Sequence, residues 1–544
     1  MPLHPCRRTG GVSMRCCPRL SAFAGWAVLA VATAALVAGA WRLTAPRPAE
    51  ARQGERAKGL EFDGAAGWLN TAGPLKMKDL RGKIVVLDFW TLCCINCIHV
   101  LPDLDKLEKK YPNEVVVVGV HTAKFDTEKT NESIRKAVLR YEIKHPVVND
   151  ADKHIWRAFG AKAWPTIMIV DPEGNLVYNE SGEGQYGDLD RAIADLIKEH
   201  KKKKTLNTRP MKFDLAQDGK SPLFFPGKVL ADPASKRLII ADSTHHRIVV
   251  TDLEGKKIAI AGDGEAGAKD GEFAKARFND PQGMALRGDT LYVADRKNHL
   301  VRELDLKKGT VKTIAGTGSQ GMSRDVDEPA LKAGLNSPWD LLLDGDRLFI
   351  AMAGHHQIWV MDLKKGRAAT YAGDGGEDIT DGTLSRSQFA QPSGLATDGK
   401  TLYVADSETS SVRAVPLGGR GEVRTLVGLD LFKFGDRDGI GANVLLQHAL
   451  GVAYHDGLLY VADTYNSKIK TLDPKTKETK TFLGGEAAGW LATPLFSEPG
   501  GIWAAGGKLY VADTNAHRIR IVDIKTKTVS TLKLSGVEAP KPAK

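Results

Sequence analysis

A strand motif, Leu-Tyr-Val-Ala-Asp or a close variant, occurs six times in the C-terminal part of the chain and limits the folds that this part can adopt. The copies end at positions 242, 295, 352, 406, 463 and 513, so successive copies lie 50 to 57 residues apart. Each copy follows a Pro-x-Gly-like segment and precedes a polar turn and two further short strands. Short strands repeated at this period predict the blades of a β-propeller, because one blade alone cannot bury both of its faces. Six copies predict six blades, and the third departs from the motif with Met352 in place of Asp.

A histidine follows the motif by four residues in four of the six copies. These histidines are His246, His299, His356 and His517. The turns around them resemble the NHL repeat over roughly residues 220–535, and some lyases of that type bind zinc through histidines from separate blades. Because this histidine belongs to the consensus of the repeat, a hydrogen bond that braces the turn is the simpler interpretation, and we expect no metal. The Asp-Gly turns between the strands lack the clustered carboxylates of a calcium site, and turn chemistry explains them.

The segment Cys93-Cys94-Ile95-Asn96-Cys97 lies where a buried-strand run, Ile84–Leu87, gives way to a helical pattern. A C-x-x-C spacing at the start of a helix lets the two sulfurs of Cys94 and Cys97 meet. The free N–H groups and the positive end of the helix dipole stabilise a thiolate there. We therefore expect Cys94 to be the nucleophile and Cys97 to resolve the mixed disulfide.

The residues around this pair resemble those of the thioredoxin fold. Asp88 stands where thioredoxins carry a buried acid, Pro102 stands where their helix is kinked, and Trp164-Pro165-Thr166 matches the segment that contains their cis-proline. The resemblance implies that Pro165 is cis and packs against the disulfide, and that Trp90, Trp164 and Thr166 line a substrate groove. Two departures, Cys93 in place of Trp and Ile95-Asn96 in place of Gly-Pro, leave the redox potential open.

Other interpretations of the cysteines remain. A structural zinc site needs about four ligands, and neither a second C-x-x-C nor a paired-histidine spacing is present. A thioredoxin fold that only binds partners is a second alternative. For Cys93, a packed inert thiol and a third redox partner are both open. We expect no cofactor besides the Cys94–Cys97 disulfide.

The N-terminal region accounts for most of the positive charge. Residues 1–58 carry nine Lys or Arg and two Glu, a net +7 out of +10, so the remainder is only +3 and nucleic-acid binding is not expected. Residues 20–41 form an uncharged apolar run that is long enough to span a membrane and is preceded by four Arg. We expect a single-pass cell-membrane protein with its globular domains on the extracytoplasmic, periplasmic side. A cleaved signal peptide, giving a secreted or periplasmic protein, is the alternative.

The chain therefore divides into several parts. We expect residues 1–58 to form a basic segment, a membrane anchor or signal peptide, and a tether, followed by an α/β thioredoxin-like domain at 59–200 and a basic linker at 201–212. An all-β six-bladed NHL propeller then occupies 213–535, and a disordered tail occupies 536–544. This combination resembles the NHL-repeat-containing proteins with an N-terminal thioredoxin-like domain. The resemblance implies a thiol–disulfide oxidoreductase whose propeller face recruits a protein substrate or partner, with an electron donor that no motif identifies. A non-catalytic binding scaffold is the alternative, and a propeller lyase or hydrolase is a weaker one.

Overall fold

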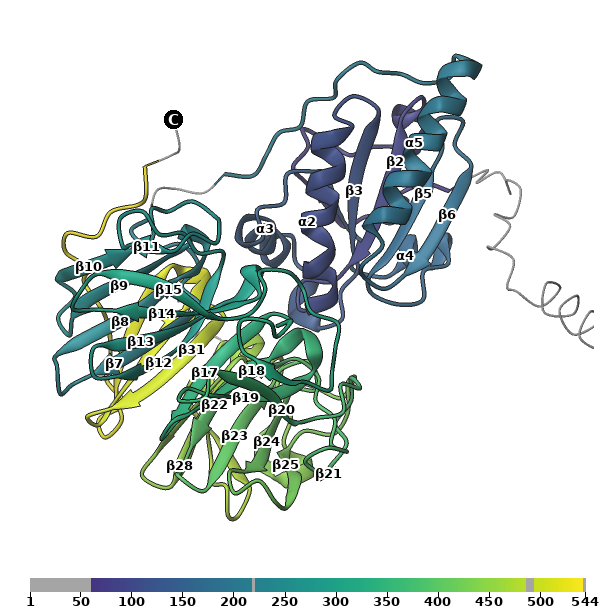
Figure 1. Ribbon diagram of the computed structural model, residues 1–544. Coiled ribbons are helices and arrows are strands. Elements are labelled where there is room, and N and C mark those ends of the chain that lie inside the picture. The colour runs from purple at the N-terminus through teal and green to yellow at the C-terminus, as the bar shows by residue number, and fades with distance from the viewer. Residues whose placement is uncertain (1–59, 218–220, 486–493, 542–544) are drawn as a thin grey trace, which may run out of the picture. The chain divides into compact units, whose positions relative to one another are not determined.

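The computed structural model describes residues 60–217, 221–485 and 494–541, all within one compact unit. A six-stranded mixed sheet forms the first domain, in the order β1-β4-β3-β2-β5-β6 (Figure 1). Its strands are β1 Gly67–Leu69, β2 Ile84–Trp90, β3 Val115–His121, β4 Val147–Asn149, β5 Thr166–Val170 and β6 Leu176–Ser181. Strands β2, β3 and β4 are parallel, and the other three are antiparallel to their neighbours. Strand β2 contains the predicted buried-strand run Ile84–Leu87.

Four α-helices and two short 3-10 helices cover this sheet. They are α2 Ile95–Lys110, α3 Asn131–Arg140, α4 His154–Phe159 and α5 Tyr186–Lys203, with η1 Met77–Leu80 and η2 Asp126–Lys129. Helices α2 and α5 pack on one face, and η1 and α4 pack on the other. Pro102 lies inside α2, as predicted. Helix α5 continues through Lys203, three residues into the run that was expected to be a linker, and the lysines of its last turn suit the negative end of the helix.

Alternation along β2 determines what lies beneath the active-site helix. Ile84 and Val86 belong to the core cluster under α2 and α5, whereas Val85, Leu87 and Phe89 belong to the opposite cluster. Because side chains alternate along a strand, Asp88 shares the α2 face. The sequence therefore places one buried carboxylate in an otherwise apolar strand, under the helix that carries the cysteines.

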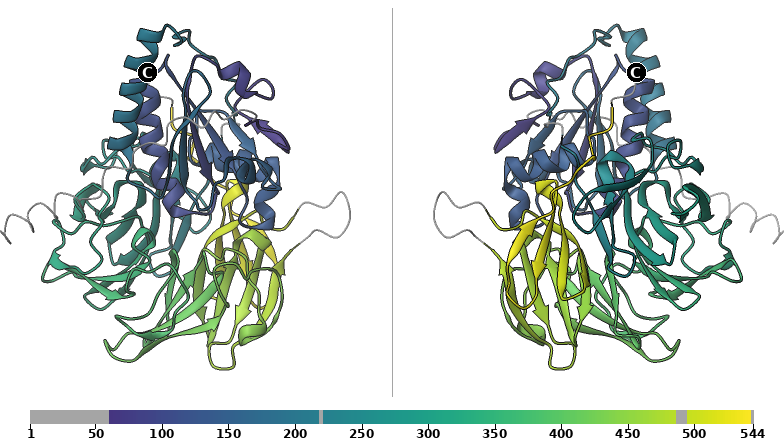
Figure 2. Two further views of the ribbon diagram at one scale, coloured as in Figure 1. Left: turned by 90° about the vertical axis from the view of Figure 1, so that its right-hand side faces the viewer. Right: turned by 90° about the vertical axis from the view of Figure 1, so that its left-hand side faces the viewer.

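Six small antiparallel sheets form the second domain (Figures 1 and 2). One strand of each sheet, its inner strand, contacts the inner strands of the neighbouring sheets, and it is named first for each blade below. This confirms the predicted fold class, a thioredoxin-like α/β domain followed by a six-bladed β-propeller. Blade 1 consists of β7 Lys228–Asp232, β8 Arg237–Asp242, β9 Arg247–Asp252 and β10 Lys257–Ala261. Blade 2 consists of β12 Pro281–Arg287, β13 Thr290–Asp295, β14 Leu300–Asp305 and β15 Thr310–Ala315, with β11 Gly271–Glu272 at the edge. Blade 3 consists of β17 Pro338–Asp344, β18 Arg347–Met352, β19 Gln357–Asp362 and β20 Arg367–Ala372, with β16 Asp327–Pro329 at the edge. Blade 4 consists of β22 Pro392–Thr397, β23 Thr401–Asp406, β24 Ser411–Pro416 and β25 Glu422–Val427, with β21 Gly382–Thr383 at the edge. Blade 5 consists of β27 Gly451–His455, β28 Leu458–Asp463, β29 Lys468–Leu472 and β30 Glu478–Gly484, with β26 Gly439–Ile440 at the edge. Blade 6 consists of β31 Pro499–Ala505, β32 Lys508–Asp513, β33 Arg518–Asp523 and β34 Val529–Thr531. Short 3-10 helices lie in the connections, at η3 Ser243–His245, η4 Arg296–Asn298, η5 Ala353–His355, η6 Gly441–Asn443, η7 Thr464–Asn466 and η8 Thr514–Ala516.

The consensus histidines join neighbouring blades. Nδ1 of His299 accepts the backbone N–H of Ser337 in the next blade at 3.0 Å, and His246, His356 and His517 do the same for Asp280, Gln391 and Phe225. In blades 4 and 5 a serine hydroxyl replaces the imidazole, from Ser410 and Ser467. The predicted hydrogen bond is therefore present, although it crosses to the next blade rather than bracing its own turn.

The ring closes between the last and the first blade, where β31 packs beside β7 (Figure 2). Thr514 Oγ1 donates to the carbonyl of Pro226 at 2.9 Å, and the backbone N–H of Lys257 donates to the carbonyl of Ser535 at 2.9 Å. The segment after β34 thus pairs with the outer strand of blade 1, and Val537 is buried against that blade.

An ion pair occupies the channel. Four inner strands carry a glycine at one equivalent position, while blades 1 and 3 carry Lys228 and Asp340 there. Lys228 Nζ lies 3.3 Å from Asp340 Oδ2 and donates to the carbonyls of Ser393 and Leu450. A Cβ at Gly283 would lie 2.2 Å from Asp340 Oδ1, so the glycine is needed there for this side chain to fit.

The predicted localisation needs correction. Among the described residues, no helix is long and apolar enough to cross a membrane. Residues 20–41, on which the prediction of a single-pass anchor with periplasmic domains depended, lie outside the described residues. The structure therefore gives no support to membrane anchoring.

Candidate active site

Cys94 and Cys97 lie at the start of α2 with their sulfurs 2.7 Å apart. Cys94 is the N-cap residue, and its sulfur accepts the backbone N–H of Cys97 at 3.2 Å. Cys94 is partly exposed, whereas Cys97 is only 1% exposed. Burial raises the pKa of Cys97 well above its usual value, and the hydrogen bond with Cys94 adds to this effect. The accessible thiol is therefore the one that the helix N-terminus contacts.

Asp88 lies beneath the pair, and no protein group within the described residues hydrogen-bonds either of its carboxylate oxygens. Burial raises the pKa of Asp88 to about 7, while the charge of His145 acts in the opposite direction. Nδ1 of His145 contacts Glu108 at 3.2 Å, and Glu108 lines a groove of about 270 Å³ beside α2. An acid with a pKa near neutrality beside a buried thiol is suited to exchange a proton with it.

Cys93 is the third cysteine of this segment and is buried. It is 2% exposed and packs among apolar side chains. Burial raises the pKa of its thiol well above the usual value, and the carboxylates of Glu128 and Glu408 act in the same direction. These surroundings disfavour a Cys93 thiolate and favour the interpretation of a packed thiol.

The residues assigned to a substrate groove have different environments. The Trp164–Pro165 peptide bond is cis, as predicted, and Trp164 packs against the cluster that contains both cysteines of the pair. Trp90 is only 1% exposed, with its ring edge-on to that of His121, so it forms part of the core and not of a groove. Thr166 is also buried, and its hydroxyl bonds to Ala163 and Ser181. Trp164 is the one of the three that is partly exposed.

The end of the thioredoxin-like domain that carries Cys94 rests on the propeller. Each inner strand is preceded or begun by a proline, which Ala449 replaces in blade 5. The residue before this position has a left-handed backbone in all six blades, with φ between 47° and 64°. Five of these six residues contact the thioredoxin-like domain. Ser337 contacts His99 (2.7 Å), Gln391 contacts Ile95 (2.9 Å), Glu498 contacts Arg140 (3.0 Å), Phe225 lies under the Arg140 guanidinium (5.3 Å), and His448 lies against Phe125 (5.4 Å between rings).

A second set of equivalent positions, two residues after the end of the strand motif, contacts the same domain in all six blades. Thr244 contacts the Arg140 carbonyl (3.5 Å), Lys297 contacts Glu142 (3.9 Å), Glu408 contacts Lys124, Tyr465 contacts Phe125 (5.4 Å between rings), Asn515 contacts Arg140, and a Cβ at Gly354 would lie 2.8 Å from His99. The repeat therefore presents two rings of residues to the thioredoxin-like domain, and we call the twelve positions the docking rings.

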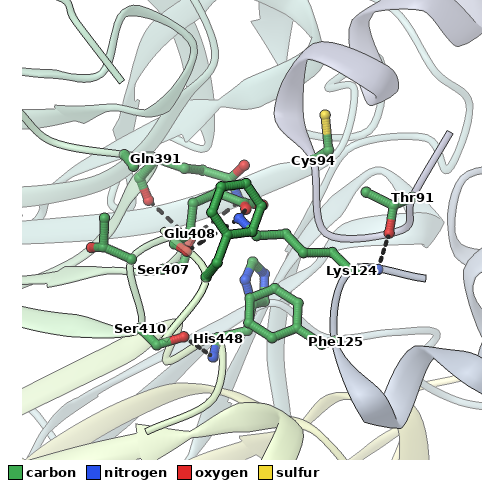
Figure 3. Close-up of polar contacts among 12 residues, drawn as sticks. Thr91, Cys94, Lys124, Phe125, Gln391, Ser407, Glu408, Ser410 and His448 are labelled. Carbon is green, nitrogen blue, oxygen red and sulfur yellow. Dashed lines mark hydrogen bonds and ion pairs between the residues drawn. The ribbon is translucent and has the colours of Figure 1, made fainter. Parts of the chain in front are cut away.

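The Lys124–Glu408 ion pair is the most buried charged contact between the domains (Figure 3). The side chains are 7% and 4% exposed. Burial alone would lower the pKa of Lys124, but Glu408 raises it overall; burial would raise the pKa of Glu408, and Lys124 lowers it overall. Both groups are therefore charged at neutral pH. Lys124 lies three residues after the end of β3, so this pair joins the active-site end of the sheet to blade 4.

Gln391 of the propeller contacts the residue that follows Cys94. Its Oε1 accepts the backbone N–H of Ile95, the first residue of α2, and its Nε2 donates to Ser407 at 3.2 Å. Ile95 itself packs against Trp339, Ala353 and Leu450 of the propeller. The propeller thus contacts the first turn of the helix that carries Cys94 and Cys97.

Sequence reasoning missed these docking residues. Gln391 and Ile95 are separated by 296 positions, and Lys124 and Glu408 by 284. The available signal was the alignment of the blades: the pre-strand and post-motif positions vary from blade to blade while their neighbours repeat. Variation at fixed positions of a repeat indicates a surface with its own role.

Among the described residues, one group has the geometry to hold a metal ion: Asp171, Glu173 and His200, at the far end of α5. Both Asp171 oxygens already accept hydrogen bonds from residues 173–175, and Lys203 lies 3.1 Å from Glu173. A nearby ammonium group and satisfied oxygens explain this cluster without an ion.

Comparison with known proteins agrees with this architecture. Residues 82–176 match a thioredoxin-like family model, and residues 278–304 match the NHL repeat. NHL repeat-containing protein 2 of Gallus gallus is 44% identical over 80% of this chain and 65% of its own length. Protein SUPPRESSOR OF QUENCHING 1, chloroplastic, of Arabidopsis thaliana is 46% identical over 81% of this chain and 44% of its own. The thioredoxin-like part is also 29% identical to thiol-disulfide oxidoreductase ResA of Bacillus thuringiensis, over 20% of this chain and 61% of that protein.

The chain spans less than two thirds of the length of the chicken and Arabidopsis proteins. The Arabidopsis relative is chloroplastic by name. The match covers both domains, and the chain is an NHL-repeat protein with an N-terminal thioredoxin-like domain, homologous to NHL repeat-containing protein 2.

Proposed function

We propose that the chain is a thiol–disulfide oxidoreductase in which Cys94 exchanges with substrate disulfides. The observation that carries the proposal is the Cys94–Cys97 pair, with sulfurs 2.7 Å apart at the N-terminus of α2 and only Cys94 accessible. A helix N-terminus favours the thiolate, which is the form that attacks a disulfide.

The reaction proceeds in two balanced steps. The Cys94 thiolate attacks one sulfur of the substrate disulfide, forms a mixed disulfide and releases the other substrate sulfur as a thiolate. Cys97 then gives its proton to the Asp88 carboxylate and attacks Cys94 Sγ, which releases the second substrate thiolate and leaves Cys94–Cys97 oxidised. The pKa of Asp88, about 7, matches this role near neutral pH. Running in reverse, the same steps oxidise a substrate dithiol.

The propeller recruits the protein substrate in this proposal, but by a different surface from the one expected. The face that carries the docking rings holds the chain's own thioredoxin-like domain, so we place the partner at the rim of that face, beside the active-site end. Met322 and Phe432 are 70% and 67% exposed there. Gln320, two residues from Met322, contacts His99, and Lys124 lies 5.4 Å from the Phe432 ring. Exposed apolar side chains beside a redox pair suit an unfolded or extended polypeptide.

Trapping tests the proposal in the full-length chain. Cys97→Ala removes the resolving thiol, so incubation with oxidised glutathione should give a stable adduct of one glutathione on Cys94, identified by peptide mass. The matched control adds Cys93→Ser to Cys97→Ala, and this double variant should form the same adduct at the same rate.

Adduct formation on Cys93, or none on Cys94, would overturn the assignment. If Cys97→Ala traps nothing while the full chain still binds polypeptides, the scaffold interpretation replaces the redox one. In the Cys97→Ala background, replacement of Met322 and Phe432 by Ser should lower trapping of a polypeptide with mispaired disulfides but not of oxidised glutathione.

A further inference from the structure

Gln391 is held so that its side-chain oxygen faces the first N–H of the active-site helix. The residue is fully buried and has a left-handed backbone, with φ of 64°. Its N–H donates to His356 Nδ1 at 3.2 Å, and its carbonyl accepts the hydroxyls of Ser393 (2.8 Å) and Ser407 (3.0 Å). The oxygen that receives the Ile95 N–H is therefore fixed by blades 3 and 4 and not by the thioredoxin-like domain.

The contact changes the electrostatics at Cys94. A helix N-terminus stabilises an anion because its first N–H groups have no partner and carry partial positive charge. In this chain Cys97 gives its N–H to Cys94 Sγ, whereas Ile95 gives its N–H to Gln391. The amide oxygen brings partial negative charge to the same helix end. A thiolate at Cys94 thus receives less stabilisation than the bare helix would provide.

Other ionisable groups near the cysteines and the start of α2 come from several elements. They are Asp88 on β2, Lys124 and Glu128 after β3, His99 on α2 and Glu408 on blade 4. The Lys124–Glu408 pair is internally neutral, and Glu128 accepts from Thr91, Lys124 and Phe125. None of these groups bonds to an N–H of the first turn of α2, so Gln391 can be varied separately from them.

We propose that Gln391 is a positioning residue through which the propeller destabilises the Cys94 thiolate and makes the Cys94–Cys97 pair a stronger reductant. The inference rests on the proposed redox function. A less stable thiolate disfavours the reduced form relative to the disulfide, and a couple whose reduced form is disfavoured has a more negative potential. The propeller then sets the direction of electron flow as well as holding partners.

Two substitutions in the full-length chain should move the redox equilibrium in opposite directions. Gln391→Leu removes the acceptor at similar volume, so the equilibrium with glutathione should shift about tenfold toward the reduced protein, equivalent to about 30 mV. Alkylation of Cys94 at pH 6 should become several-fold faster. Gln391→Glu keeps the acceptor and adds negative charge, so both quantities should move the other way. A purely structural role would not produce opposite signs.

Asn515→Ala is the matched control, because Asn515 belongs to the docking rings but contacts Arg140 instead of α2. It should leave both quantities within about twofold of the wild type. An equal shift from Asn515→Ala would assign the effect to loosened docking and overturn the proposal, as would shifts of the same sign in both Gln391 variants. If the wild type forms no Cys94–Cys97 disulfide in the presence of oxidised glutathione, the proposed redox function is wrong. If the wild type forms the disulfide but neither Gln391 variant changes the equilibrium with glutathione, only the role of Gln391 is refuted.

Discussion

The two domains carry their functional residues in opposite ways. In the thioredoxin-like domain, Cys94, Cys97, Asp88 and Pro165 each occur once, and each is recognisable from its neighbours. In the propeller, the recognisable residues are the repeated ones, and these hold the blades together. The histidine–N–H bonds between blades are the example. The residues that contact the active site, Gln391 and Glu408, occupy positions at which the blades differ.

This difference shows where function lies in a repeat protein. A consensus residue has to satisfy the same geometry in every blade, so it is a poor candidate for a task performed once. Blade 3 departs from the consensus at Met352. In the other blades an oxygen of the consensus aspartate accepts a backbone N–H from the segment before the inner strand. In blade 3 the equivalent N–H, that of Asn336, lies 3.3 Å from the Met352 sulfur. The blade still forms because its remaining contacts are intact.

The largest expected effect comes from breaking the pair that joins the two domains. Lys124→Ala leaves the Glu408 carboxylate buried without its partner, and such a change typically costs about 3–5 kcal/mol. We expect a lower denaturant midpoint and rapid alkylation of Cys93, which is 2% exposed while the domains are docked. Lys124→Met with Glu408→Leu should recover most of the loss, because no unpaired charge remains.

The matched control for that change is Lys129→Ala, whose ion pair with Asp126 is exposed. It should change stability by less than about 0.5 kcal/mol. Unaltered Cys93 alkylation in Lys124→Ala would mean that the buried pair does not hold the domains together.

A smaller effect is expected inside the thioredoxin-like domain, from Asp88→Asn. The pKa of Asp88 is about 7 in the folded protein and near 3.8 when unfolded, so the folded form binds the proton more tightly. Wild-type stability should therefore fall as pH rises from about 4 to 7, and the variant should lack this fall. At pH 8 we expect Asp88→Asn to be about 2–4 kcal/mol more stable. Urea unfolding from pH 4 to 8 measures this, and a difference independent of pH would refute it. The variant should also resolve mixed disulfides more slowly.

The smallest effect is expected for a consensus residue of the propeller. His299→Ala removes the acceptor of the Ser337 N–H and should cost about 1–2 kcal/mol. His299→Ser should restore part of this, because Ser410 and Ser467 accept the same bond in other blades. Thermal unfolding of the wild type, His299→Ala and His299→Ser ranks their stabilities, and we expect the serine variant to lie between the other two. If alanine and serine are equally destabilising, the bond between blades is not what the position contributes.

The sequence predicted those features whose cause is local. The apolar run Ile84–Leu87 located β2, and the repeat period predicted six blades. The cis Trp164–Pro165 bond followed from the resemblance to thioredoxin. Burial of Trp90 and docking of the domains depend on contacts between distant segments, such as Ile95 with Gln391, which no local pattern encodes. The membrane assignment is corrected: it depended on residues 20–41, which lie outside the described residues, and no described helix is long and apolar enough to cross a membrane.

The left-handed residues before the inner strands have a consequence for how such proteins change over time. At these six positions the backbone is held by bonds to the neighbouring blade, and the side chains range from Phe225 to Glu498. The amino acid there can change with little effect on the core of any blade. Gene fusions that join other domains to a propeller of this kind can therefore evolve a fitted interface one blade at a time, through single substitutions that leave the ring intact.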